Sequence, residues 1–230
     1  MRHYRIIIAI ALVLFIVSKS GLANIARILC QKSSEYICHT IKRGESWISL
    51  FPNSTERDLV MRLNRMNIPL YGGEKIAIPK NHDYDLLEQS PLPSKITPLG
   101  KKLIYVSINP SVLAWGAYNS AGTLVAWGPA VGARGWCPDI HRACHTSLGR
   151  FSIYRKEGPG CISSKFPVPR GGAPMPYCMY FHGGFALHGS YEVPGYNASH
   201  GCVRLFVPDA KWLNQDFVSG ERDVAVIITN

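Results

Sequence analysis

The chain has 230 residues, of which 47% are apolar and 17% are charged, a composition that supplies the core of one or two domains. Its mean hydropathy of +0.02 excludes a protein made largely of membrane-spanning helices. The formal net charge of +10 favours an anionic partner, either an envelope polymer or a membrane surface, and by itself also suits a nucleic acid.

The first residues have the organisation of an export signal. Residues 1–5 carry two arginines and a histidine, residues 6–17 are an unbroken apolar run, and residues 21–23 place small side chains where signal peptidase reads. The apolar run would form a helix of about 18 Å, shorter than a bilayer core of roughly 30 Å. We expect residues 1–23 to be a signal peptide that engages the membrane during export to the periplasm or cell envelope, with an uncleaved signal anchor as the alternative. Export argues against nucleic acid as the partner, and we find no nucleic-acid motif.

The seven cysteines are an odd number for an exported chain, in which cysteines usually pair as disulfides. Six cysteines allow 15 pairings, so the sequence does not fix the connectivity. Proximity along the chain predicts three disulfides and leaves Cys202 as the free thiol; the pairs are Cys30–Cys38, Cys137–Cys144 and Cys161–Cys178.

Residues 36–79 predict a small unit with the order β-α-α-β. A strand pattern covers residues 36–41, and Ser46 can cap a helix that starts at Trp47. A second helix opens at residues 54–56, and residues 75–79 form a closing strand after a glycine turn.

This unit resembles a LysM module, a small binder of N-acetylglucosamine polymers. The resemblance is carried by residues 44–47 (Gly-Glu-Ser-Trp), Leu59, Asn64 and residues 73–79 (Gly-Glu-Lys-Ile-Ala-Ile-Pro). It implies binding to the glycan of peptidoglycan; a structural domain without a ligand is the alternative.

Residues 80–100 are rich in proline and serine and predict a linker. From residue 101 onward, short strand patterns alternate with turns, which is typical of a mainly β domain, either a sandwich or a barrel. The predicted strands cover residues 103–108, 112–118, 123–131 and 224–229, and a short helix is expected over residues 208–213.

Cys202 lies in the most distinctive motif of the chain, Ser199-His200-Gly201-Cys202-Val203-Arg204. A thiol with an ordinary pKa of about 8.5 needs a base or a cationic neighbour to act as a nucleophile at neutral pH. Two histidines are available. His188 ends an apolar run, and the loop after it can fold back toward Cys202, whereas His200 would share a face with Cys202 in an extended segment.

Other groups of the motif suit the same chemistry. The amides of Gly201 and Cys202 are candidate donors for an oxyanion hole. Arg204 has the geometry to hold a carboxylate in two-point contact.

These residues together resemble the signature of the L,D-transpeptidase (YkuD) family. His188-Gly189 followed by the Ser-His-Gly-Cys-Val-Arg motif carries the resemblance, and residues 146–151, 175–177 and 185–188 also fit. The resemblance covers residues 101–229. It implies a mainly β, sandwich-like catalytic domain that acts on peptidoglycan stem peptides without a cofactor or a metal.

The resemblance also implies roles for individual residues. Cys202 would be the nucleophile and His188 the general base, oriented by the backbone carbonyl of Gly189 or Ser190. An acyl-cysteine would form on the stem tetrapeptide with release of D-Ala, and an amine on another stem or on a protein would resolve it. The residues expected to bind substrate or support the site are Gly189, Ser190, Ser199, His200, Gly201 and Arg204.

Several alternatives remain open at this point. Water could resolve the acyl-enzyme, which would make the protein an L,D-carboxypeptidase, or the chain could be a non-enzymatic wall-binding protein. A sortase-like enzyme is a weaker alternative, because its Thr-Leu-x-Thr-Cys run is missing. Residues 137–145 hold two cysteines and two histidines that could bind zinc, although an oxidising compartment favours a disulfide.

Overall fold

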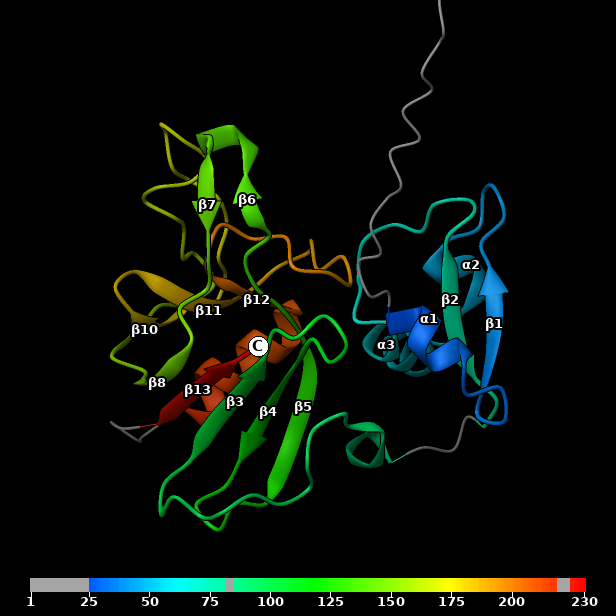
Figure 1. The fold of residues 1–230 in the computed structure, drawn as a ribbon, viewed down its shortest axis with the longest axis horizontal. Helices are drawn as coiled ribbons and strands as arrows, with labels where there is room; N and C mark the ends of the chain where they lie inside the picture. The colour runs from blue at the N-terminus through cyan, green and yellow to red at the C-terminus, as the bar shows by residue number, and fades with distance from the viewer. Residues whose placement is uncertain (1–24, 82–84, 219–223) are drawn as a thin grey trace, which may run out of the picture.

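The computed structural model describes residues 25–81, 85–218 and 224–230; the predicted signal peptide lies outside the described residues. The N-terminal unit (residues 25–81) lies beside a larger sheet domain made of the remaining described residues (Figure 1). Within these described ranges, no helix combines the length and the apolar character needed to cross a membrane.

The N-terminal unit has the predicted β-α-α-β order. Strand β1 (Tyr36–Thr40) pairs antiparallel with β2 (Lys75–Pro79), and helices α2 (Trp47–Leu50) and α3 (Ser54–Leu63) lie between them in the chain. Ser46 caps α2, as predicted. The side chain of Asn53 caps α3 by accepting from two backbone amides. Each cap satisfies donors that the helix itself leaves unpaired.

A helix that the sequence did not predict, α1 (Ile25–Cys30), precedes this unit. The disulfide between Cys30 and Cys38 links α1 to β1. Ile25 is buried together with Val193 and Phe206 of the sheet domain, so α1 packs against both parts of the molecule.

The predicted linker is more ordered than its composition indicates. Residues 86–89 form a 3-10 helix, and Leu92 is buried against the sheet domain. The backbone of Ser94 accepts from the Leu124 amide, and Ile96 donates to Gly122. The segment is held because its apolar side chains and its backbone both find partners on the edge of the sheet domain.

One nine-stranded sheet dominates the sheet domain, in the order β8-β13-β3-β4-β5-β12-β11-β10-β9. Most neighbours are antiparallel, whereas β13 with β3 and β11 with β12 are parallel pairs. The strands are β3 (Leu103–Ser107), β4 (Ala114–Tyr118), β5 (Leu124–Val131), β8 (Gly149–Ser152), β9 (Arg155–Lys156), β10 (Met179–His182), β11 (Phe185–Gly189), β12 (Val203–Leu205) and β13 (Ala225–Thr229).

The predicted strands at residues 103–108, 112–118, 123–131 and 224–229 are therefore confirmed. Helix α4 (Val207–Trp212) matches the predicted short helix, and one π-helical turn extends it to Phe217. A separate hairpin of β6 (Gly135–Cys137) and β7 (Arg142–Cys144) projects from the sheet domain (Figure 1).

The sandwich-like arrangement that we expected takes the form of a single curled sheet. Side chains of β3 (Ile104, Val106) and of β10 to β12 (Met179, Leu187, Val203) belong to one buried cluster, although these strands lie far apart in the strand order. The two halves of the sheet face one another across this core, which explains why the strand pattern is that of a sandwich.

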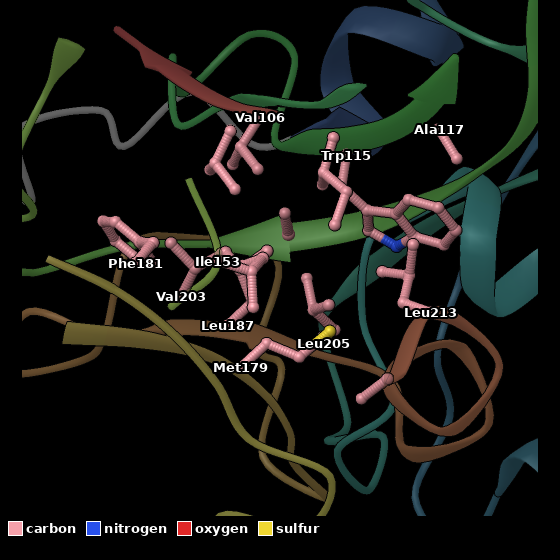
Figure 2. Close-up of a cluster of buried hydrophobic side chains, with 14 of the residues drawn as sticks. Val106, Trp115, Ala117, Ile153, Met179, Phe181, Leu187, Val203, Leu205 and Leu213 are labelled. Atoms are coloured by element: carbon pink, nitrogen blue, oxygen red, sulfur yellow. The ribbon is translucent and has the colours of Figure 1, made fainter. Parts of the chain in front are cut away.

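Figure 2 shows the centre of this core, where Leu213 lies beside the indole of Trp115 and Val106 lies near Ile153. Burial of each of these side chains contributes about 1.5–3 kcal/mol. The indole N–H of Trp115 donates to the carboxylate of Asp209 at 3.2 Å, so the one polar atom of this large side chain is satisfied. The core gives β11 and β12, which carry the candidate site, a fixed position.

Candidate active site

Two adjacent parallel strands bring the motif residues together. β11 pairs with β12 so that Leu187 lies opposite Val203 and His188 opposite Arg204. Leu187 and Val203 point into the core. Because side chains alternate along a strand, His188 and Arg204 lie on the other face of the sheet. Cys202 immediately precedes β12, two residues before Arg204.

His188 is a buried imidazole with a defined orientation. Its Nδ1 lies 2.9 Å from the carbonyl oxygen of Gly189, which can only accept, so Nδ1 carries the proton and Nε2 is the unprotonated nitrogen. Burial lowers the pKa of His188 to about 4, and the charge of Arg204 acts in the same direction, whereas the Gly189 hydrogen bond opposes both. The ring is therefore neutral at pH 7. Of the two carbonyls expected to orient it, Gly189 provides the contact.

Cys202 is the free cysteine, and the three predicted disulfides are confirmed. Burial raises the pKa of the Cys202 thiol, against the opposing effects of a backbone hydrogen bond at Ala186 and of the Arg204 charge. Cys202 packs on a cluster that includes the Cys161–Cys178 disulfide. Burial thus favours the neutral form of both groups, a thiol at Cys202 and an imidazole at His188.

A tight turn presents Cys202. The hydroxyl of Ser199 donates to the Cys202 carbonyl at 2.6 Å and accepts from the Gly201 amide at 3.0 Å. Gly201 has a φ of +153°, and a Cβ there would collide with the ring of Phe185. Glycine is required for both reasons. The Gly201 amide, which we expected to serve an oxyanion hole, is already paired with Ser199, so the Cys202 amide is the remaining candidate donor.

His200 faces away from this pair. Its Nε2 lies 2.7 Å from a carboxylate oxygen of Asp139, and its ring stacks on Phe166 with a centroid distance of 4.3 Å. The hydrogen bond from His200 lowers the pKa of Asp139. His200 therefore links the motif to the turn between β6 and β7 through Asp139, and to the segment between β9 and β10 through Phe166.

Two neighbouring arginines, Arg204 and Arg134, lie at the site, and the charge of Arg204 acts on the thiol. Arg204 donates from Nη1 to the backbone carbonyl of Glu192 at 3.2 Å, and Arg134 donates to the carbonyl of Ala198 at 2.7 and 3.1 Å. Burial is the main cause that lowers the pKa of Arg204, Glu192 opposes it, and the nearby charge of Arg134 lowers the pKa further. These hydrogen bonds to main-chain carbonyls use only some of the N–H groups of each guanidinium. The other N–H groups can donate to a ligand.

The remaining motif residues support the loop after β11. The Gly189 amide donates to the Pro176 carbonyl, and a Cβ at Gly189 would press on the backbone of Val207 and Pro176. Ser190 donates through its amide to the Leu205 carbonyl at 2.8 Å, and its hydroxyl accepts from the Glu192 amide. Both residues thus shape the site through the backbone.

The zinc alternative is wrong for this chain. Cys137 and Cys144 form a disulfide, with 5.9 Å between their Cα atoms, and have no thiolate to offer a metal. The two groups of possible ligands among the described residues each depend on a disulfide-bonded cysteine: Cys137 in one, and Cys161 with Cys178 in the other.

Sequence reasoning missed Asp139, Arg134 and Phe166 as parts of the site. His200 lies 61 residues from Asp139 in the chain, and Ala198 lies 64 from Arg134. No local pattern marks such pairs, because each depends on how the loops fold over the sheet.

Comparisons with known proteins agree with this geometry. The family model for the L,D-transpeptidase catalytic domain (YkuD) matches residues 101–227, more than half of the chain. A comparison with curated proteins found no match.

Three solved structures are similar to this chain. An L,D-transpeptidase from Xylanimonas cellulosilytica has a TM-score of 0.50 and 23% identity, with 62% of this chain and 66% of that chain covered. One from Stackebrandtia nassauensis has a TM-score of 0.46 and 20% identity, with 63% of this chain and 62% of that chain covered. One from Mycobacterium smegmatis has a TM-score of 0.43 and 16% identity, with 70% of this chain and 65% of that chain covered. The match thus spans just under two thirds of each of these chains, and the first similarity supports the fold.

Proposed function

Because the chain belongs to the L,D-transpeptidase (YkuD) family, we propose that it is a peptidoglycan L,D-transpeptidase with Cys202 as nucleophile and His188 as general base. The observation that carries the proposal is the pairing of β11 with β12, which puts a free thiol diagonally across from an imidazole whose Nε2 is left unprotonated by the Gly189 contact. Nucleophilic catalysis by cysteine requires a base near the thiol, and this diagonal placement supports that role for His188.

In the proposed first half-reaction, the sulfur of Cys202 attacks the carbonyl carbon of the third residue of a stem tetrapeptide. His188 Nε2 takes the thiol proton during the attack and passes it to the nitrogen of the departing D-Ala. A thioester to Cys202 forms as the peptide bond breaks. The neutral resting state of both groups suits this order, because proton transfer then accompanies attack instead of preceding it.

In the second half-reaction, an amine on another stem or on a protein attacks the thioester. His188 accepts the amine proton and returns it to the sulfur, which restores the thiol. We assign the amide of Cys202 as a donor to the developing oxyanion, because the Gly201 amide is already paired with Ser199. Ser199 and Gly201 hold the turn that aims it.

Substrate recognition is assigned to the cationic side of the site. Stem peptides carry carboxylates, and the charges of Arg204 and Arg134 repel each other, although Glu192, with an oxygen 3.6 Å from Arg204, and Asp139, whose charge acts on Arg134, balance them in part. A substrate carboxylate would relieve the repulsion between the two guanidinium groups and gain charge-assisted hydrogen bonds. We assign His200, held by Asp139 and stacked on Phe166, to the support of the loop that carries Cys202.

We also propose that the N-terminal unit is a LysM-like module that binds the glycan of peptidoglycan. The β-α-α-β order of residues 36–79 and the sequence matches at residues 44–47 and 73–79 support this assignment. Three disulfides suit an oxidising, extracytoplasmic compartment, to which a signal peptide over residues 1–23 would direct the chain.

The test is incubation of the protein with tetrapeptide muropeptides, followed by mass spectrometry of products and protein. We expect release of D-Ala and an acyl adduct on Cys202, and Cys202→Ala should abolish both while retaining the fold. The absence of both signals in the unmodified protein would contradict the enzymatic proposal.

The same experiment identifies the acceptor. With a labelled amine or a second stem present, a transpeptidase forms the joined product, whereas an L,D-carboxypeptidase yields only the tripeptide. A wall-binding protein without activity would sediment with peptidoglycan equally well before and after Cys202→Ala and would form no adduct.

A further inference from the structure

The N-terminal unit reaches the loop that joins His188 to Cys202. Asn67, just after α3, makes three hydrogen bonds to this loop. Its amide donates to the Val193 carbonyl at 2.9 Å, its Oδ1 accepts from the Val193 amide at 2.8 Å, and its Nδ2 donates to the Ser190 carbonyl at 2.9 Å. Met66 and Pro194 form a bridge beside it. Asn67 thus acts as a short strand partner for residues 190–193.

The loop that Asn67 binds also accepts hydrogen bonds from two groups of the site, the His188 imidazole and the Arg204 guanidinium. The Gly189 carbonyl, which accepts from His188, belongs to the peptide whose nitrogen is Ser190. Ser190 is fixed on one side by the hydrogen bond from its amide to the Leu205 carbonyl and on the other by the hydrogen bond from Asn67 to its carbonyl. Two residues later, the carbonyl of Glu192 accepts from Arg204. The orientations of the imidazole and the guanidinium therefore both depend on the course of residues 189–193.

We propose that Asn67 is a positioning residue of the active site, through which the N-terminal unit fixes the loop that orients His188 and Arg204. The unit is then part of the working site in addition to any glycan it binds. The kinetic consequence rests on the proposed L,D-transpeptidase activity, whereas the effect on the orientation of His188 does not.

Loss of the Asn67 side chain should leave the two parts of the molecule docked. Arg62 is paired with Asp209 of α4, and the Arg65 side chain donates to the Val112 carbonyl and lies over the ring of Trp127. These contacts lie outside the 190–193 loop. Asn67→Ala should therefore loosen the loop locally.

The experiment compares three full-length proteins labelled with ¹⁵N-histidine: the unmodified chain, Asn67→Ala and Asn53→Ala. Asn53→Ala is the matched control, because it removes an asparagine side chain from the other end of α3, where it caps the helix and does not touch the loop. Histidine tautomers are read by NMR, and D-Ala release from the tetrapeptide gives kcat and KM.

We expect His188 to hold a single tautomer, protonated at Nδ1, in the unmodified protein and in Asn53→Ala. In Asn67→Ala the ring should exchange between tautomers, and kcat/KM should fall about tenfold or more, since small displacements of a catalytic group are costly. Unchanged His188 signals and rate in Asn67→Ala, or equal losses in Asn53→Ala, would overturn the inference.

Two further outcomes are also decisive. If the unmodified protein releases no D-Ala, the proposed function fails, and the His188 spectra decide the positioning role by the same criteria. If Asn67→Ala does not fold, Asn67→Asp takes its place, because it keeps the acceptor for the Val193 amide and replaces the donor to Ser190 with a carboxylate oxygen that repels the Ser190 carbonyl.

Discussion

Arg62 of α3 and Asp209 of α4 form a two-point ion pair, with N–O distances of 2.6 and 2.9 Å, although 147 residues separate them in the chain. Both side chains are buried, and the indole of Trp115 donates to the same carboxylate. Gly128 provides the space, since a Cβ there would collide with Asp209, Trp115 and Arg62. The pair joins the N-terminal unit to the helix that packs beneath the candidate site.

Arg62→Met should lower the free energy of unfolding by about 3–5 kcal/mol, because it leaves the Asp209 carboxylate buried without its cation. Urea titration measures this loss. The double variant Arg62→Met/Asp209→Leu should regain most of it. Lys32→Met is the control, since it breaks an exposed pair with Glu35 that contributes less than about 1 kcal/mol. An equal, small loss in Arg62→Met and the control would contradict the prediction.

The Cys202 thiol should react slowly with iodoacetamide at pH 7, and the rate should rise steadily above pH 8.5. The reason is that burial raises its pKa and that His188, with a pKa of about 4, does not form an ion pair with it at rest. Alkylation rates measured between pH 5 and 10 check this, with Cys202→Ser as the unlabelled control. A plateau reached already near pH 6 would indicate a preformed thiolate–imidazolium pair.

His188 should make the protein less stable in acid. Its pKa in the folded state is about 4, whereas in the unfolded chain it is about 6.5. Between these values the unfolded state binds the extra proton, so the free energy of unfolding falls as the pH drops from about 6.5 to about 4. The free energy of unfolding should fall by about 3 kcal/mol over this range. Urea titrations at pH 7, 5.5 and 4.5 should show a shallower decline for His188→Gln than for the unmodified protein, and parallel curves would exclude this origin.

Gly201→Ala should be destabilising by roughly 1–3 kcal/mol and should slow D-Ala release, because the new methyl group meets the Phe185 ring and shifts Cys202. Gly160→Ala, where the added methyl group meets open space, should leave both stability and rate unchanged. Thermal unfolding and the muropeptide assay measure the two effects. Recovery of stability in Gly201→Ala/Phe185→Ala would support the steric cause, and an unaffected single variant would refute it.

The sequence was informative where the relevant signal is local. Caps, turns and short apolar runs predicted the β-α-α-β unit, and nearest-neighbour pairing predicted all three disulfides. Spacing was misleading for His200. The rule that residues two apart share a face holds only in regular strands, and Gly201, with its φ of +153°, breaks that regularity between His200 and Cys202.

Contacts between distant segments were beyond the reach of sequence patterns. Asn67, Arg62 and Asp139 are ordinary polar residues in their local context, and their partners lie 61 to 147 residues away. The single curled sheet was missed for a related reason. Core-facing and outward-facing side chains alternate along its strands in the same way as they do in a sandwich. The ordered segment at residues 85–100 was missed because its partners lie on the edge of the sheet domain.

Cys202 is the last of the seven cysteines in the chain, and none of the three disulfides encloses it. The bonded partners are 8, 7 and 17 residues apart, so each pair is complete before the next pair begins. A chain that enters an oxidising compartment with its N-terminus first can therefore close all three disulfides before Cys202 arrives. On the proposed export route, this order would protect the thiol from mispairing, whereas all seven sulfurs compete at once when the fully reduced protein is refolded.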